Sequence, residues 1–196
     1  MPFSADTGVR AWWLLCGVAA AGAVLAWPLP AALIDWQPGL AGSQPWRWWS
    51  AAFVHWSPLH LGANLVGVAV LAAFGWAAAL PVRAAVAWAL AWPLTQGTLL
   101  LQPALAHYGG LSGVLHAGVA VGATVLVLQR RGRPRLIGAA VGAGLLVKIG
   151  LERPWAGPLA HPAGWDIAVA PLAHAGGALA GLVCALLIAG PRMQAR

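Results

Sequence analysis

Charged side chains are scarce in this chain: aspartate, glutamate, lysine and arginine together make up 8% of its 196 residues. A soluble domain of this length would carry about a quarter. Because 61% of the residues are hydrophobic, the chain cannot cover a folded surface with polar groups, and we expect its solvent to be largely lipid. The net charge of +7 comes without a polar basic surface, which argues against nucleic acid as a partner.

Acidic residues and cysteines are rarer still, and their scarcity narrows the possible chemistry. The chain has four carboxylates, none central to a long apolar segment, and no H-E-x-x-H sequence. These absences exclude an aspartyl protease pair and a zinc protease of the H-E-x-x-H kind. The two cysteines, Cys16 and Cys184, lie in apolar runs and are too few for a disulfide framework.

The chain has instead about six apolar segments, each close to the roughly 20 residues that cross a bilayer as a helix. They are expected at 11–34, 57–79, 84–103, 110–128, 136–151 and 168–190. Prolines fall at or near the breaks, where a helix ends at little cost. The sequence therefore predicts an all-α membrane protein, a single domain over 1–196 with six transmembrane helices. Arg10 ahead of an apolar run also fits a signal peptide, although Trp13 suits its cleavage site poorly.

Basic residues predict how these helices are oriented. In a six-span arrangement most arginines fall on one side: Arg10, Arg83, Arg130, Arg131, Arg133, Arg135, Arg192 and Arg196. Arg47, Lys148 and Arg153 fall on the other side. The positive-inside rule then places both termini in the cytoplasm. The tryptophan-rich connections 35–56 and 152–167 face outward, where indole rings suit the membrane interface.

Three histidines lie within the predicted spans, where ionisable groups are costly and therefore indicate function. They are His60, His116 and His174. His60, Ser112 and His174 occupy the first turns of the second, fourth and sixth spans, which run in the same direction. We therefore expect them at a similar depth, toward the outer face. Asn64 follows His60 by four residues and His116 follows Ser112 by four, so each pair shares a helix face.

Small residues accompany these polar groups. Gly177 and Gly181 follow the last histidine by three and seven residues, and Gly110 and Gly113 flank the serine. Stripes of this kind let membrane helices approach closely. A serine oxygen needs such an approach to reach an imidazole on another helix.

Ser112 and His174 are therefore the candidate nucleophile and general base. The imidazole would take the hydroxyl proton and return it to the leaving amine. The acid nearest to His174 in sequence is Asp166, expected at the interface, so we expect a Ser–His dyad with no carboxylate behind it. The side chains of His60 and Asn64 and the backbone N–H of Ser112 suit an oxyanion hole.

The segments that carry these residues resemble the rhomboid intramembrane serine proteases. They read WRWWSAAFVHWSPLHLGANL, GLSG and AHAGGALAG. They reproduce that family's WR loop motif, its H-x4-H-x3-N helix, its G-x-S-G helix and its A-H-x-x-G-x-x-x-G helix. Order and spacing agree over essentially the whole chain.

The resemblance implies Ser112 as nucleophile, His174 as base, His60 with Asn64 as oxyanion donors, and no metal or cofactor. It implies that the substrates are single-span membrane-anchored proteins in the lipid bilayer. It also implies that three further residues support the site and the outer loop: His55, Trp46 and Arg47.

This chain differs from many rhomboids at two positions. Many rhomboids have a tyrosine one turn after the nucleophile, packed on the catalytic histidine. This chain has His116 there, which either replaces that packing or donates a hydrogen bond of its own. Many also carry an acidic residue after the second helix, where this chain has FGWAAALPVR.

The compact length, the GLSGVLH segment and the short connection between the second and third helices resemble the rhombosortase branch of the family. That likeness implies an enzyme of the bacterial inner membrane with its site toward the periplasmic face. Its substrates would carry a C-terminal Gly-Gly motif, a short hydrophobic helix and a basic tail.

Two other functions stay open. A catalytically inactive rhomboid-like protein would bind membrane partners, although the usual loss of the serine or histidine is not seen here. A haem or metal protein would use His60, His116 and His174 as ligands. That function would leave Ser112 and Asn64 unexplained.

Overall fold

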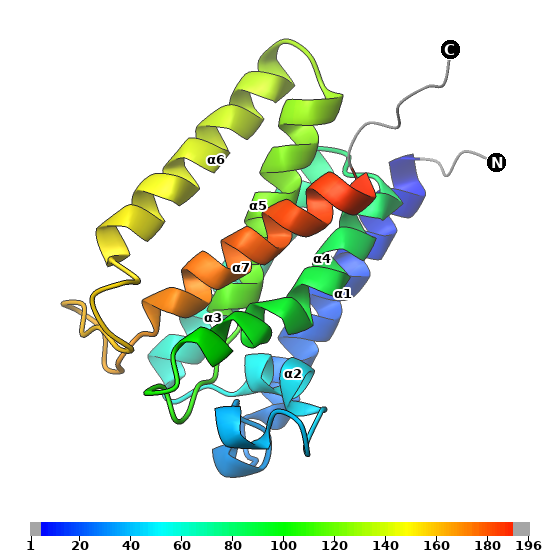
Figure 1. Ribbon diagram of the computed structural model, residues 1–196. Helices are drawn as coiled ribbons and strands as arrows, with labels where there is room; N and C mark the ends of the chain where they lie inside the picture. Colours follow the sequence, from blue (N-terminus) through cyan, green and yellow to red (C-terminus); the bar gives the residue numbers. More distant parts are fainter. Residues whose placement is uncertain (1–4, 190–196) are drawn as a thin grey trace.

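The computed structural model describes residues 5–189, which fold as a bundle of helices (Figure 1). Within this range six helices are long and apolar enough to cross a membrane. They are α1 (Ala5–Ala26), α3 (Pro58–Ala77), α4 (Val82–Gly97), α5 (Ser112–Gln129), α6 (Arg133–Glu152) and α7 (Pro171–Cys184). The 3-10 turn η4 (Thr98–Leu101) extends α4, and the π-helical turn η5 (Ala185–Ala189) extends α7. The predicted six-helix architecture is confirmed.

The boundaries of two spans differ from those expected. The first helix ends at Ala26 rather than near residue 34, and the 3-10 turns η1 (Ala31–Leu33) and η2 (Pro38–Leu40) follow it. Prolines at 28 and 30 lack the N–H that a continuing helix would use. The fifth span is longer than expected, because Pro134 lies in its first turn, where a proline interrupts no hydrogen bond. The end of the sixth expected span, with Arg192 and Arg196, lies outside the described residues.

The helices differ in how much of their surface other helices cover. α4, α5 and α7 are the most buried and α6 is the least. Figure 1 shows α6 at the edge of the bundle, beside α5, and α6 packs mainly against α5 and only slightly against α7. Most of α6 is therefore free to face lipid or the cavity described below.

The long connections that the sequence predicts to face outward gather at one end of the bundle. The short helix α2 (Arg47–Ser50), the 3-10 turn η3 (Ala51–Phe53) and the connection 153–170 lie at the end opposite the start of α1 (Figure 1). Trp36 and Tyr108 exchange backbone N–H···O bonds of 2.8 and 3.0 Å. The connection 27–57, named the outer loop after its predicted side, therefore holds the segment that leads into α5.

Candidate active site

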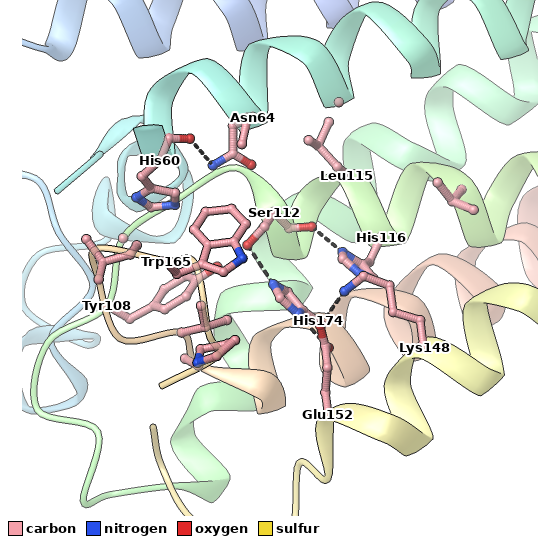
Figure 2. Close-up of a pocket in the computed structure, with 18 of the residues that line it drawn as sticks. His60, Asn64, Tyr108, Ser112, Leu115, His116, Lys148, Glu152, Trp165 and His174 are labelled. Carbon is pink, nitrogen blue, oxygen red and sulfur yellow. Dashed lines mark hydrogen bonds and ion pairs between the residues drawn. The ribbon is translucent and has the colours of Figure 1, made fainter. Parts of the chain in front are cut away.

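Ser112 begins α5, His174 lies in the first turn of α7, and their side chains meet (Figure 2). The Ser112 hydroxyl donates to His174 Nε2 across 2.8 Å, and His174 is buried. With Nε2 accepting, the neutral imidazole carries its proton on Nδ1. In that tautomer Nε2 is able to take the serine proton.

Glycines let α5 and α7 come close enough for this contact. A Cβ on Gly177 would lie 2.0 Å from the carbonyl oxygen of Gly113, and one on Gly181 would lie 2.2 Å from that of Ala117. A Cβ on Gly113 would lie 2.8 Å from the carbonyl oxygen of Ala173. The small-residue stripe seen in the sequence thus lies where the two helix backbones touch.

A carboxylate lies behind His174, so the expectation of a dyad without one is wrong. His174 Nδ1 donates to Glu152 Oε2 across 2.7 Å. Glu152 is the last residue of α6, and the 153–170 connection folds back so that this helix end meets the start of α7. Asp166, the nearer acid in sequence, instead accepts a hydrogen bond of 2.8 Å from the Ser57 hydroxyl.

Lys148 binds the other oxygen of the same carboxylate. Its Nζ pairs with Glu152 Oε1 one helical turn away on α6. The side chains of Glu152 and Lys148 are 25% and 49% exposed, whereas that of His174 is 6% exposed. The acid therefore lies at the rim of the buried pair, held by a cation on one side and the imidazole on the other.

His116 stacks on His174. The ring centroids are 4.2 Å apart and the ring planes differ by 7°. The Nδ1–H of His116 also donates to the carbonyl oxygen of Ser112 across 2.6 Å. The two alternatives considered for this residue, packing and a hydrogen bond of its own, therefore occur together.

The residues expected as oxyanion donors lie on α3, and both are buried. The hydroxyl of Ser57, the N-cap, accepts a hydrogen bond of 3.1 Å from the N–H of His60. The Trp56 N–H donates to His60 Nδ1 across 3.3 Å, which leaves the proton of the neutral ring on Nε2. The amide of Asn64 donates one hydrogen to the His60 carbonyl oxygen at 3.1 Å and has a second to give. Both side chains line the same cavity as Ser112.

Gly110 lies against the His60 ring. Its φ is +136°, which side chains rarely tolerate, and a Cβ there would lie 2.8 Å from His60 Nε2. His55 packs on the same ring with centroids 4.7 Å apart, and its Nδ1–H donates to the Phe53 carbonyl oxygen across 3.0 Å. Burial lowers the pKa of His55 below its usual value, so the ring is neutral near pH 7. His55 therefore supports His60 by packing rather than by charge.

Tyr108 is a site residue that no sequence motif identifies. It is buried, and its hydroxyl donates to the carbonyl oxygen of Gly110 across 3.2 Å. Burial raises the pKa of Tyr108 to about 12, so the phenol stays neutral. Its place as the one tyrosine of the chain, directly before the glycines of the serine motif, is the signal that could have revealed it.

A buried ion pair holds the outer loop. Arg47 Nη1 lies 2.9 Å from Asp35 Oδ1, with side chains 4% and 1% exposed. Arg47 also donates to the carbonyl oxygens of Asp35 at 2.6 Å and Ala32 at 2.9 Å. His107 Nδ1 lies 2.7 Å from Asp35 Oδ2, so the same carboxylate reaches the segment before α5. Trp46, in contrast, is exposed on the loop.

A cavity of about 810 Å³ opens beside the serine (Figure 2). Nine of the polar side chains described above line it: His60, Asn64, His107, Tyr108, Ser112, His116, Lys148, Glu152 and His174. It extends along α3 as far as Phe74, and most of its lining is apolar and comes from α3, α5 and α6. Trp165, from the 153–170 connection, also lines it. The polar cluster therefore opens onto a largely apolar space.

One group of described residues has metal-ligand character: His116, Glu152 and His174, whose ligand atoms lie within 4.8 Å of one another. His60 is not part of it. The stacked imidazoles hold their ring nitrogens in nearly parallel planes, so their in-plane lone pairs do not converge on one ion. Both Nδ1 atoms already face oxygen acceptors. This geometry favours proton transfer over metal coordination.

The sequence profile of the Rhomboid domain matches residues 42–191. The matched range runs from the outer loop through η5 and contains Ser112, His174 and Glu152. A search of curated proteins finds no significant match to the chain. Since the profile covers well over half of the sequence and the helices form the expected bundle, the chain belongs to the rhomboid family, which includes intramembrane serine proteases.

Proposed function

We propose that the protein is an intramembrane serine endopeptidase with Ser112 as nucleophile and His174 as general base. The observation that carries this proposal is the 2.8 Å hydrogen bond from the Ser112 hydroxyl to His174 Nε2. A serine held on a neutral imidazole is the arrangement that activates a weak oxygen nucleophile. The cavity beside it has room for a peptide segment.

In this mechanism Ser112 Oγ attacks the carbonyl carbon of the scissile bond while its proton passes to His174 Nε2. The negative charge that develops on the carbonyl oxygen is met by the Ser112 N–H, His60 Nε2–H and Asn64 Nδ2–H. The imidazolium then protonates the leaving amine, the C–N bond breaks, and an ester forms on Ser112. Water, deprotonated by His174, hydrolyses the ester and restores the enzyme.

The substrates are membrane-anchored proteins with a single span, which lie beside α3 and α6 and present an unwound segment to the cavity. Rhombosortase-type processing is the narrower proposal, with a Gly-Gly motif ahead of a short hydrophobic helix and a basic tail. Support comes from GLSGVLH and from His116 in place of the tyrosine common in other rhomboids. Glycines also unwind easily and bring no side chain into a crowded site.

The protein resides in the bacterial inner membrane with its termini in the cytoplasm and its site toward the periplasm. Arg130 and Arg131 lie between α5 and α6, and Arg133 and Arg135 lie in the first turn of α6, so all four are at the helix ends remote from Ser112 and Glu152. By the positive-inside rule that end is cytoplasmic.

Labelling with a fluorophosphonate probe tests the nucleophile without a substrate. We expect detergent-purified wild type to react, Ser112→Ala and His174→Ala to lose the label, and His116→Ala to keep part of it. A helical, monodisperse wild type that never reacts would favour the inactive rhomboid-like binding protein instead.

The narrower substrate proposal is tested by co-expression with a reporter whose anchor carries Gly-Gly, a hydrophobic helix and a basic tail. The matched control carries Val-Val in place of Gly-Gly. We expect cleavage of the first reporter by wild type and none by Ser112→Ala. Equal cleavage of both reporters would contradict Gly-Gly specificity while leaving the protease proposal intact.

A further inference from the structure

We propose that Glu152 is a positioning residue for His174, so that the site works as a Ser–His–Glu triad rather than a dyad. The inference rests on the proposed function. Its basis is a continuous line of contacts across three helices, drawn in Figure 2. The Ser112 hydroxyl donates to His174 Nε2 at 2.8 Å, and His174 Nδ1–H donates to Glu152 Oε2 at 2.7 Å.

The first consequence concerns the tautomer. A carboxylate only accepts hydrogen bonds, so Glu152 requires a proton on Nδ1 and leaves Nε2 with its lone pair toward Ser112. His116 cannot do this for His174, because its own Nδ1–H is committed to the Ser112 carbonyl oxygen. Of the groups in these contacts, Glu152 alone selects the tautomer that accepts the serine proton.

The second consequence concerns charge. When His174 takes the serine proton, an imidazolium forms in a side chain that is 6% exposed. An isolated buried cation of this kind is costly, and an adjacent anion offsets much of the cost. Glu152 supplies that anion at the rim, where its side chain is partly exposed and water can stabilise its charge.

Lys148 gives this inference a distinctive signature. It contacts Glu152 Oε1, and a lysine ammonium only donates hydrogen bonds. In Glu152→Gln the amide oxygen would therefore turn to Lys148 and the amide NH₂ would face His174 Nδ1. The NH₂ group would move the ring proton to Nε2, where it blocks the base. We therefore expect the near-isosteric variant Glu152→Gln to react more slowly than the truncated variant Glu152→Ala.

The test compares fluorophosphonate labelling rates of detergent-purified full-length variants. We expect Glu152→Ala to react about 10-fold more slowly than wild type, because the base is still free but less well oriented. We expect Glu152→Gln to react on the order of 100-fold more slowly, because the base is blocked, a loss at the lower end of what general-base catalysis contributes. Both should change the maximal rate and not the probe concentration for half-saturation. Combining Lys148→Met with Glu152→Gln frees the amide to flip and should recover part of the loss. The matched acid-to-amide control is Asp6→Asn, in the first turn of α1 and remote from the site.

A merely structural role for Glu152 predicts the reverse order, since Gln fills the same space and Ala does not. Reaction of Glu152→Gln at or above the rate of Glu152→Ala would therefore overturn the inference. The proposed function would survive that result as long as wild type reacts and Ser112→Ala does not.

A spectroscopic measurement separates the two proposals further. In ¹⁵N-histidine-labelled protein, the Nδ1 proton that His174 shares with Glu152 should give a downfield ¹H signal, which its absence in His174→Ala distinguishes from any signal of His107 beside Asp35. We expect the signal in wild type and Ser112→Ala and its loss in Glu152→Ala and His174→Ala. Persistence of the signal in Glu152→Ala would refute the positioning contact. A protein that shows the expected signal pattern but never reacts would overturn the proposed function and, with it, the catalytic role of the contact.

Discussion

The carbonyl oxygen of Gly113 lies 2.0 Å from where a Cβ on Gly177 would be. No side chain, not even a methyl group, fits between α5 and α7 at this point. The contact lies next to Ser112 and three residues after His174 along α7. The backbone approach and the serine–histidine hydrogen bond therefore depend on each other.

Gly177→Ala should separate α5 from α7 and break the hydrogen bond between Ser112 and His174. We expect at least a tenfold loss of fluorophosphonate reactivity and a destabilisation of about 1 to 3 kcal/mol, as for overpacked interiors. Gly17→Ala on α1, where a Cβ would meet nothing within 4 Å, is the control and should be neutral or slightly stabilising. Thermal unfolding in detergent measures both. A wild-type midpoint and rate for Gly177→Ala would show that the helices can separate without cost.

His116 substitutions separate its two contacts. His116→Phe keeps a flat ring on His174 but removes the donor to the Ser112 carbonyl oxygen, whereas His116→Ala removes both. Because an aromatic pair contributes about 0.5 to 1.5 kcal/mol, loss of the stack should slow labelling by roughly 2- to 10-fold. We expect His116→Phe to fall between wild type and His116→Ala. Equal rates for the two variants would assign the effect to the hydrogen bond instead.

Arg47→Ala should destabilise the outer loop, because the substitution leaves the carboxylate of Asp35 buried without its cation. Breaking a buried pair in this way costs about 3 to 5 kcal/mol. The double variant Asp35→Ala with Arg47→Ala should be less destabilised than Arg47→Ala alone, since no uncompensated charge remains. Arg135→Ala, at an exposed position, is the control. Limited proteolysis and thermal unfolding measure the change. A double variant that is less stable than Arg47→Ala would contradict the prediction.

The raised pKa of Tyr108 predicts that the folded protein loses stability at high pH. Its pKa is about 12 in the folded protein against an ordinary value of 10.0, so folding favours the neutral phenol. That stability is fully present below pH 10 and falls as pH rises through 12, by about 2 to 3 kcal/mol for a shift of this size. Tyr108→Phe should lack this component. The measurement is the difference in unfolding midpoint between the two proteins from pH 9 to 12, and a constant difference would refute the prediction.

Much of the architecture follows from local properties that are readable in the sequence. Six apolar runs predict six spanning helices, because backbone groups in lipid must be satisfied within the segment. The spacing of His174, Gly177 and Gly181 predicts a close helix contact on the histidine's own face. The first span was harder to delimit, because the apolar residues 27–34 continue its hydrophobic run even though prolines end the helix.

The residues that support Ser112 and His174 could not be identified from local sequence patterns. Glu152 is 22 positions from His174 and reads as a loop acid beside Arg153. Its role depends on where α6 ends and on how the 153–170 connection returns the chain to α7. Tyr108 and Asp35 are similar cases, since both act through contacts made by a folded loop.

The sequence by itself therefore determined the number of helices, the family, and the candidate serine and histidine, because each depends on composition or on spacing along one helix. Only the tertiary structure decided which carboxylate stands behind His174 and which cation holds that carboxylate. It also decided that His116 both stacks and donates. The physical reason is that a hydrogen bond between helices needs atoms within about 3 Å, and the fold alone sets such distances between segments.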